Sequence, residues 1–302
     1  GRWGVELAVI ERAGTLVVRA RGAGVANARY RVRAFALDGA AGRALPAAAW
    51  RWWSQAYDDA GADNVAGYTK ALDRLRIVEA ALAARDGAAD DWLLQVRLGV
   101  ANLLRRSLRH DEAVAAYDAL LTKLDPRAQP EWAMRANNGK GLSLRESARF
   151  PEADAAFAQA ELLGDAGHDP YEWVSARNNR CLVKHHYGNL AAARDCYAAV
   201  IPAYRKVAPE QVGVPILNLA AAAAALGQPA LALANYREAL ELRRAGTDRM
   251  SLALVLLNLA VLEARTGAWP DALAHSLEAQ QVFEASGNRA RLAGVLLARG
   301  WM

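Results

Sequence analysis

Two hydrophobic periodicities divide the chain. Residues 1–37 alternate apolar and polar side chains with a period of two, most clearly from Ala28 to Leu37, where arginines alternate with apolar residues. This alternation is typical of half-buried strands. It predicts about three strands, over Val5–Ile10, Gly14–Arg21 and Ala28–Leu37. Three strands form a poor core by themselves, so we expect them to be the remnant of an incomplete β-sandwich.

From Pro46 onward the pattern becomes helical and stays so. We expect a linker and a first helix over residues 38–63, followed by helical repeats over 64–302. The predicted repeats occupy 64–86 (partial), 94–127, 134–168, 174–208, 213–246, 253–287 and 290–302 (partial). The apolar end of the chain, with Leu297, Trp301 and Met302, differs from a polar capping helix, so we expect the natural protein to continue.

Five turn-and-helix segments can be aligned by their small residues. These are Ala113, Ala153, Ala193, Ala232 and Ala272, at spacings of 40, 40, 39 and 40. Four residues after each alanine come Tyr117, Phe157, Tyr197, Tyr236 and Ser276. Positions four apart share one face of a helix, so the small residue permits a close helix approach and the ring fills the gap to the next repeat. Stacking of such units supplies a core that one unit lacks.

The turns between the helices carry their own signals. Gly188, Gly227 and Gly267 precede three of the aligned helices, where a positive φ is expected. Pro151 and Pro270 lie near the first turn of their helices, where a missing N–H costs nothing. These positions support boundaries between paired helices.

The repeats resemble the tetratricopeptide repeat family, in the long version of about 40 residues found in kinesin light chains and in many bacterial regulators. The closest stretch is Leu256–Leu273, L-L-N-L-A-V-L-E-A-R-T-G-A-W-P-D-A-L. The resemblance covers roughly Asn64–Met302. It implies a mainly α fold, a right-handed solenoid of antiparallel helix pairs in which the first helix of each pair lines a concave groove.

Asparagines recur near the middle of the predicted first helices. They are Asn138, Asn178, Asn179, Asn218 and Asn258. Asparagine is a mediocre helix former, so its repetition needs a reason. The resemblance to kinesin light chains implies a ladder of amides that bind the backbone of an extended peptide. The alternative is that the amides bind neighbouring helices and stabilise the stack, and both interpretations stay open here.

The predicted groove changes character along its length. Its early part is polar and basic, and the candidate peptide contacts there are Asn102, Arg105, Arg135, Arg145 and His185. Its later part is apolar, with Leu217, Ala221, Ala224, Leu257 and Val261. A partner with an acidic portion and an apolar portion would fit both parts. The alternative is that the charged residues are simply solvated.

Motifs of catalysis or cofactor binding are missing from the sequence. It contains no phosphate-binding loop, no H-E-x-x-H and no G-x-S-x-G. Cys181 and His185 lie one helical turn apart, with Cys196 on the next helix, which permits a metal site or a nucleophile pair. We favour buried packing cysteines that form no disulfide framework. The sequence therefore predicts a protein-interaction scaffold without cofactor, metal or catalytic residues.

The distribution of charge bears on the class of partner. Residues 1–37 hold seven arginines and two acids, whereas the remainder holds 30 basic and 30 acidic residues and is neutral. A neutral body lacks the basic stripe of a nucleic-acid binder. The longest apolar stretch, around Leu217–Leu226, is too short to span a membrane. We expect a protein or peptide partner, and favour a cytoplasmic location, with a periplasmic one open if a signal peptide precedes Gly1.

The order of the segments suggests a second resemblance. Strands at Gly14–Arg21 and Ala28–Leu37, then a linker and long repeats, are similar to the front of bacterial CHAT-domain proteins, the caspase-like peptidases. This implies a regulatory arm of a cysteine peptidase whose catalytic domain lies beyond this chain, and that domain would itself be a possible partner. A sensory solenoid of a transcriptional regulator is the third alternative.

Overall fold

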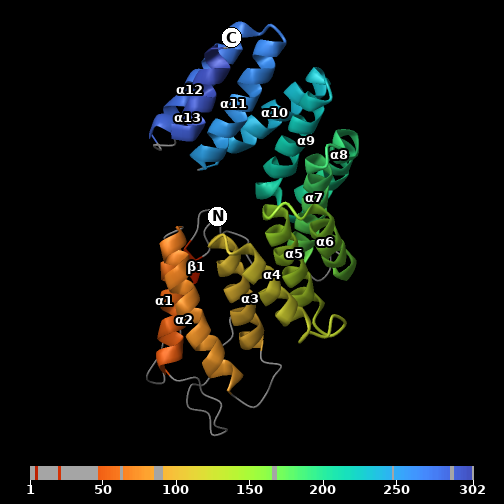
Figure 1. Ribbon diagram of the computed structural model, residues 1–302. Coiled ribbons are helices and arrows are strands. Elements are labelled where there is room, and N and C mark those ends of the chain that lie inside the picture. Colours follow the sequence, from red (N-terminus) through yellow and green to blue (C-terminus); the bar gives the residue numbers. More distant parts are fainter. Residues whose placement is uncertain are drawn as a thin grey trace. The chain divides into compact units, whose positions relative to one another are not determined.

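The computed structural model of the protein is almost entirely helical. It describes residues 4–5, 20–21, 47–61, 64–84, 91–164, 169–246, 248–285 and 289–300. These fall into two compact units, Gly1–Asp125 and Pro126–Met302. Figure 1 shows each unit as a series of helices packed side by side, so the mainly α prediction is confirmed.

The N-terminal strands are described only in part. β1 (Gly4–Val5) pairs antiparallel with β2 (Ala20–Arg21), with Gly4 opposite Arg21 and Val5 opposite Ala20. Both strands fall in regions where the alternating pattern predicts β structure or its edge. The rest of the predicted strands lies outside the described residues, so the β-sandwich remnant stays a prediction.

The described part of the first unit contains four helices, each packed on the next along the chain. They are α1 (Ala47–Gly61), α2 (Val65–Ala83), α3 (Asp91–Arg106) and α4 (His110–Leu121). Asn64 caps α2 by accepting a hydrogen bond of 2.8 Å from the Gly67 N–H. The buried Trp53 of α1 meets Trp92 of α3 edge to face, with ring centroids 5.2 Å apart. Large rings thus join α1 to the repeat helices.

The second unit is a stack of antiparallel helix pairs. Its elements are α5 (Pro130–Glu146), α6 (Phe150–Leu163), α7 (Pro170–His186), α8 (Leu190–Val207), the 3₁₀ turn η1 (Pro209–Gln211), α9 (Gly213–Ala225), α10 (Pro229–Arg244), α11 (Arg249–Arg265), α12 (Trp269–Ala285) and α13 (Arg289–Gly300). From α5 to α13, consecutive helices pack against each other (Figure 1). This is the arrangement expected of a tetratricopeptide-type solenoid.

The aligned residues of the repeats explain the close packing. The five column alanines and the rings of Tyr117, Phe157 and Tyr197 are fully buried. A Cβ atom added at Gly141 of α5 would lie 2.6 Å from the Phe157 ring of α6, closer than carbon atoms can approach. The small residue on the first helix therefore makes room for the ring on the second.

The turns within the pairs share one backbone geometry. Among the described residues, a positive φ angle occurs at Leu108 (62°), Ala148 (60°), Gly188 (76°), Gly227 (69°) and Gly267 (86°). At each turn the following N–H donates back to the preceding helix, as from Arg149 to the Leu144 carbonyl at 2.8 Å. The prediction of positive φ at the three glycines is confirmed. Two turns adopt it without glycine.

None of the helices in the described part of the chain has both the length and the apolar character needed to cross a membrane.

Candidate functional site

Polar side chains of α5 and α7 form a connected group between the two helices. Asn138 of α5 donates to the Glu172 carboxylate at 2.6 Å, and its side-chain oxygen accepts from Asn179 of α7 at 3.2 Å. Arg145 donates to the Asn179 oxygen at 3.3 Å. The two asparagines are only 3% and 7% exposed. We call Asn138, Arg145, Glu172 and Asn179 the amide network, which ties neighbouring first helices together.

The start of α7 adds an ion pair to this face. Asp169 is the N-cap of α7 and accepts from the Glu172 N–H at 3.2 Å. Its carboxylate also accepts two hydrogen bonds from the Arg135 guanidinium of α5, at 2.7 and 3.0 Å. The positive charge expected at Arg135 is therefore neutralised by Asp169 at the start of α7.

Glu172 lies in an environment that disfavours its charge. Burial raises the pKa of this carboxyl above its ordinary value, and the neighbouring Asp169 carboxylate acts in the same direction. The hydrogen bond from Asn138 and the charge of Arg135 lower the pKa and only partly compensate. Neither Glu172 nor Asp169 was among the site residues predicted from sequence.

The remaining asparagines of the predicted ladder are not bound in this way. Asn178 of α7 is 6% exposed, and its side-chain oxygen is buried without a hydrogen-bond partner. Asn218 of α9 is half-buried and Asn258 of α11 is exposed. Among the interactions of the described residues, neither amide is engaged in a hydrogen bond. A buried acceptor without a donor costs free energy, so Asn178 is an unusual position in this core.

The five asparagines occupy two different registers. Asn218 and Asn258 each precede the small residue of their helix, Ala220 or Ala260, by two positions, as Asn179 precedes Cys181. Asn138 and Asn178 precede theirs by three positions. The 39-residue spacing between Ala193 and Ala232 produces this offset, so residues 40 apart across it are not structurally equivalent. The single ladder expected from sequence is thus two partial rows.

Two further predicted contacts lie beside the tyrosine column. In the first unit, Asn102 accepts a hydrogen bond of 2.6 Å from the Tyr117 hydroxyl, while Arg105 is half-buried on the same helix. In the second unit, His185 lies against Tyr197, with ring centroids 6.4 Å apart. Burial, with a smaller contribution from His186, lowers the pKa of the His185 imidazole.

The Tyr197 hydroxyl and the His185 Nδ1 atom are both buried without a hydrogen-bond partner. Leu182 takes the place that Asn102 has before Tyr117, fifteen residues before the ring, and a leucine offers no acceptor. The interface between α7 and α8 therefore lacks a polar contact that α3 and α4 possess.

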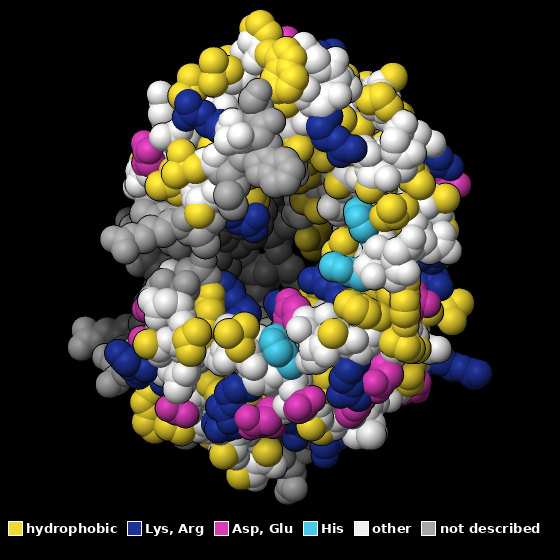
Figure 2. Space-filling model, turned by 45° about the horizontal axis from the view of Figure 1, so that its top comes forward, with side chains coloured by type: hydrophobic (Ala, Val, Ile, Leu, Met, Phe, Trp, Pro, Cys, Tyr) yellow, Lys and Arg dark blue, Asp and Glu magenta, His cyan; other side chains and the backbone are white. Residues whose placement is uncertain are grey.

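The residues expected to form the apolar later part of the groove lie on α9 and α11. α9 contains no charged residue, and its Leu217, Ala221 and Ala224 are half-buried. Leu257 of α11 is half-buried and Val261 is exposed. On the face shown in Figure 2, basic and acidic side chains are interspersed instead of forming a patch of one sign. The surface therefore offers apolar contacts and amides without a strong field.

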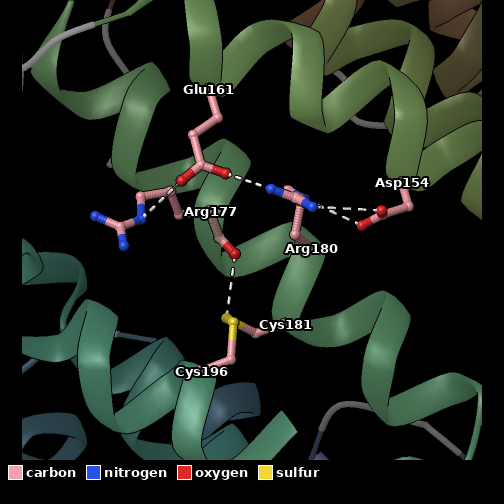
Figure 3. Close-up of a disulfide and its surroundings, with 6 residues drawn as sticks. All are labelled: Asp154, Glu161, Arg177, Arg180, Cys181 and Cys196. Carbon is pink, nitrogen blue, oxygen red and sulfur yellow. Dashed lines mark hydrogen bonds and ion pairs between the residues drawn. A yellow bond between two sulfur atoms is a disulfide. The ribbon is translucent and has the colours of Figure 1, made fainter. Parts of the chain in front are cut away.

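The two cysteines correct a sequence expectation. Cys181 of α7 and Cys196 of α8 form a disulfide, with a Cα–Cα separation of 5.4 Å (Figure 3). The expectation that they pack without bonding is wrong, because the two positions face each other across the helix pair within disulfide reach. Since both sulfurs are joined, neither is a thiol nucleophile. In the described parts of the chain, no three potential metal ligands gather.

The helix that carries Cys181, α7, also forms ion pairs with α6. Arg180 pairs with Asp154 at 3.1 Å and with Glu161 at 2.7 Å. Arg177 pairs with the same Glu161 at 3.2 Å. Figure 3 shows these ion pairs on one side of α7 and the disulfide on another. The helix with the unpartnered Asn178 is therefore held by both of its sequence neighbours.

Comparisons with known proteins match one part of the chain to a family and the stacked helices to several solved folds. Residues 211–285 match the family model described as tetratricopeptide repeat. None of the curated proteins matches the chain at a significant level. Among solved structures, BtubC (BKLC) from P. vanneervenii is 16% identical with a TM-score of 0.59, over 74% of this chain and 91% of that chain.

Two Rap structures are also similar. The apo form of RapI is 16% identical with a TM-score of 0.63, over 83% of this chain and 69% of that chain. The Rap conjugation gene regulator of the plasmid pLS20, in complex with the Phr* peptide, is 16% identical with a TM-score of 0.56, over 83% of this chain and 74% of that chain. At these identities the similarity concerns the fold. Residues 211–285 therefore match the tetratricopeptide repeat family by sequence, and the stacked helix pairs share the fold of these solved structures.

Proposed function

We propose that this chain is a protein-interaction scaffold that binds a peptide or protein segment along the first helices of its second unit. Asn178, Asn218 and Asn258 are the proposed contacts to the backbone of the partner. The observation that carries the proposal is the buried, unpartnered side-chain oxygen of Asn178. A backbone N–H from a partner would satisfy this acceptor and remove its desolvation penalty.

The contrast among the asparagines sharpens the assignment. The side-chain amides of Asn138 and Asn179 are already hydrogen-bonded within the amide network, so we assign them to stabilising the stack. Asn218 and Asn258 have no such partners among the described residues and lie at more exposed positions. We therefore assign partner binding to these two, which share one register, and to Asn178, which lies in the other register.

Similar folds bind peptides in other proteins. The pLS20 regulator was solved with the Phr* peptide, and a Rap protein was solved with the competence and sporulation factor. These complexes support a binding role for a stack of this type. The alternatives of a peptidase arm and of a transcriptional sensor stay predictions, because they concern domains outside this chain.

The charges argue for an apolar segment in the partner. α9 is uncharged, and Leu217, Leu257 and Val261 offer apolar surface near Asn218 and Asn258 in sequence. The Arg135 charge is paired with Asp169, which weakens the attraction for an acidic segment. We infer an extended partner segment with apolar side chains and few charges.

A displayed library of random peptides, selected on the intact chain, tests the proposal. The dissociation constant of a selected peptide would then be measured for Asn178→Ala, Asn218→Ala and Asn258→Ala. Each lost hydrogen bond should weaken binding about tenfold. Asn235→Ala is the matched control, because its amide donates to the Leu231 carbonyl of its own helix, α10. Failure to select any peptide, or equal affinity of all four variants, would refute the proposal.

A further inference from the structure

The disulfide joins positions that are both alanines in the helix pair α3–α4. Cys181 lies sixteen residues before Tyr197, and Ala101 lies sixteen residues before Tyr117. Cys196 directly precedes Tyr197, and Ala116 directly precedes Tyr117. The pair α3–α4 therefore closes at this point without a covalent bond, and the disulfide is an addition to a contact that the repeat can make from small residues.

Non-covalent contacts are weaker where the disulfide lies. The buried Tyr197 hydroxyl and His185 Nδ1 have no partners, whereas the Tyr117 hydroxyl of α4 is bound to Asn102 of α3 at 2.6 Å. Each unsatisfied buried group favours opening of the interface to water. The covalent bond opposes that opening between α7 and α8.

The other side of α7 does not depend on sulfur chemistry. Its ion pairs to Asp154 and Glu161 of α6 involve no cysteine (Figure 3). Breaking the disulfide therefore removes the covalent link between α7 and α8 and does not involve the contacts between α7 and α6. Asn178 lies three residues before Cys181 and His185 four residues after it, so both share the helical face next to the released bond.

We propose that the Cys181–Cys196 disulfide is a redox latch that holds the binding face of α7 in place, so that its reduction weakens partner binding. The inference concerns the regulation of the binding site around Asn178 and rests on the proposed function. Oxidised protein keeps the latch closed, and a dithiol reductant opens it.

The different burial of the two cysteines indicates which sulfur atom is attacked when the disulfide is reduced. Cys196 is half-buried, whereas Cys181 is fully buried. One thiolate of the dithiol attacks the Cys196 sulfur, the S–S bond breaks, and Cys181 leaves as a thiolate that takes up a proton. The second thiol then displaces Cys196 from the mixed disulfide. Two electrons and two protons pass to the protein, and the dithiol becomes a disulfide.

Hydrogen exchange of the intact chain tests the latch without any partner. Amide exchange would be compared between oxidised protein, protein reduced with dithiothreitol, and Cys181→Ala/Cys196→Ala. We expect exchange in α8 and the second half of α7 to be about tenfold faster in the reduced protein and in the variant. The pair α11–α12 contains no cysteine and serves as the internal control. Unchanged protection of α7 and α8 on reduction would overturn the latch.

A second experiment measures the affinity of a peptide that was selected on the oxidised chain. Its dissociation constant should rise about tenfold on reduction, and the alanine variant should bind weakly with or without dithiothreitol. The variant is expected to fold because it recreates the pair Ala101 and Ala116 of α3–α4. Faster exchange with unchanged affinity overturns the regulatory inference and leaves the proposed function standing. Absence of peptide binding in the oxidised state overturns the proposed function itself.

Discussion

Asn179 of α7 donates a hydrogen bond of 3.2 Å to the side-chain oxygen of Asn138 on α5, one whole repeat earlier in the chain. Both amides are buried, and each has a second partner, Glu172 for Asn138 and Arg145 for Asn179. A hydrogen-bonded group of this kind stabilises the stack, and its members are already hydrogen-bonded in the protein without a partner.

Removal of this bond should reduce stability. Asn138→Ala leaves Asn179 and Glu172 without one of their partners, so we expect the free energy of unfolding to fall by about 2 kcal/mol. Asn258→Ala, at an exposed position, should change it by less than about 0.5 kcal/mol. Urea denaturation followed by circular dichroism measures both. Equal effects of the two substitutions would contradict the division between structural and binding asparagines.

The turn at Ala148 should tolerate glycine better than alanine. Its φ of 60° lies in the left-handed region, which disfavours residues with a Cβ atom. We expect Ala148→Gly to raise the free energy of unfolding by about 0.5 to 1 kcal/mol, after the entropy of glycine in the unfolded chain is subtracted. The reverse change, Gly267→Ala, should lower it by a similar amount. Thermal melts compare the two, and a destabilised Ala148→Gly would contradict the strain argument.

The helix pair α11–α12 contains a buried carboxylate that lies against a histidine. Glu263 of α11 is 1% exposed, and one of its oxygens lies 2.7 Å from His275 Nδ1 of α12. His275→Ala would leave this carboxylate buried and uncompensated. We expect a loss of about 3 kcal/mol in the free energy of unfolding, measured by denaturant titration.

A double substitution distinguishes charge from packing at the same place. Glu263→Leu/His275→Ala recreates Leu144 and Ala156, which occupy the corresponding positions of α5 and α6 and are buried there. We expect this variant to recover most of the stability lost in His275→Ala, because well-packed apolar residues replace a buried pair at little cost. A double variant as unstable as the single one would show that packing around His275 is the main contribution.

The raised pKa of Glu172 makes stability depend on pH. The folded protein binds the Glu172 proton more tightly than the unfolded chain does, whose ordinary pKa is 4.5. The contribution to stability is therefore fully present below pH 4.5 and is lost as the pH rises through the folded-state pKa. Glu172→Gln keeps an acceptor for Asn138 and removes the titration. The stability of the wild type relative to this variant should fall as the pH rises above 4.5, and a constant difference would refute the assignment.

The helix pairs were predictable because their residues repeat in columns. Ala153 and Phe157, four apart on the predicted helix, are both fully buried at the contact with α5. Spacing also predicts the turn geometry. Leu108 and Ala148 lie 40 residues apart and Ala148 lies 40 before Gly188, so their positive φ follows from position in the repeat and not from residue type.

The candidate site was only partly predictable. Asn138, Asn179, Arg135 and Arg145 do gather on α5 and α7, but Asp169 and Glu172, which pair with them, were missed. Their position at the start of the next first helix was a usable signal, since it lies about one repeat after Arg135 and Asn138. Which amide becomes buried depends on how the helices pack in space, and sequence spacing does not contain that information.

The disulfide shows the same limit of pattern analysis. Cys181 and Cys196, 15 residues apart on adjoining helices, fit a pair of packed thiols as well as a bonded pair. The choice depends on the distance and direction of two Cβ atoms across the helix pair. The equivalent positions of α3–α4 are the small residues Ala101 and Ala116, which is consistent with a close approach of the two helices there.

Most of the buried apolar residues of α7 through α13 belong to one continuous cluster, which extends from Val174 to Val295. In a stack where each pair is stabilised mainly by its neighbours, such continuity couples the unfolding of distant helices. Denaturation of this part should therefore be cooperative, with one midpoint for probes placed on α7 and on α12. A cavity made at Phe283 would then increase the fraction of molecules in which Asn178 is unfolded, so that partner affinity is sensitive to packing several helices away.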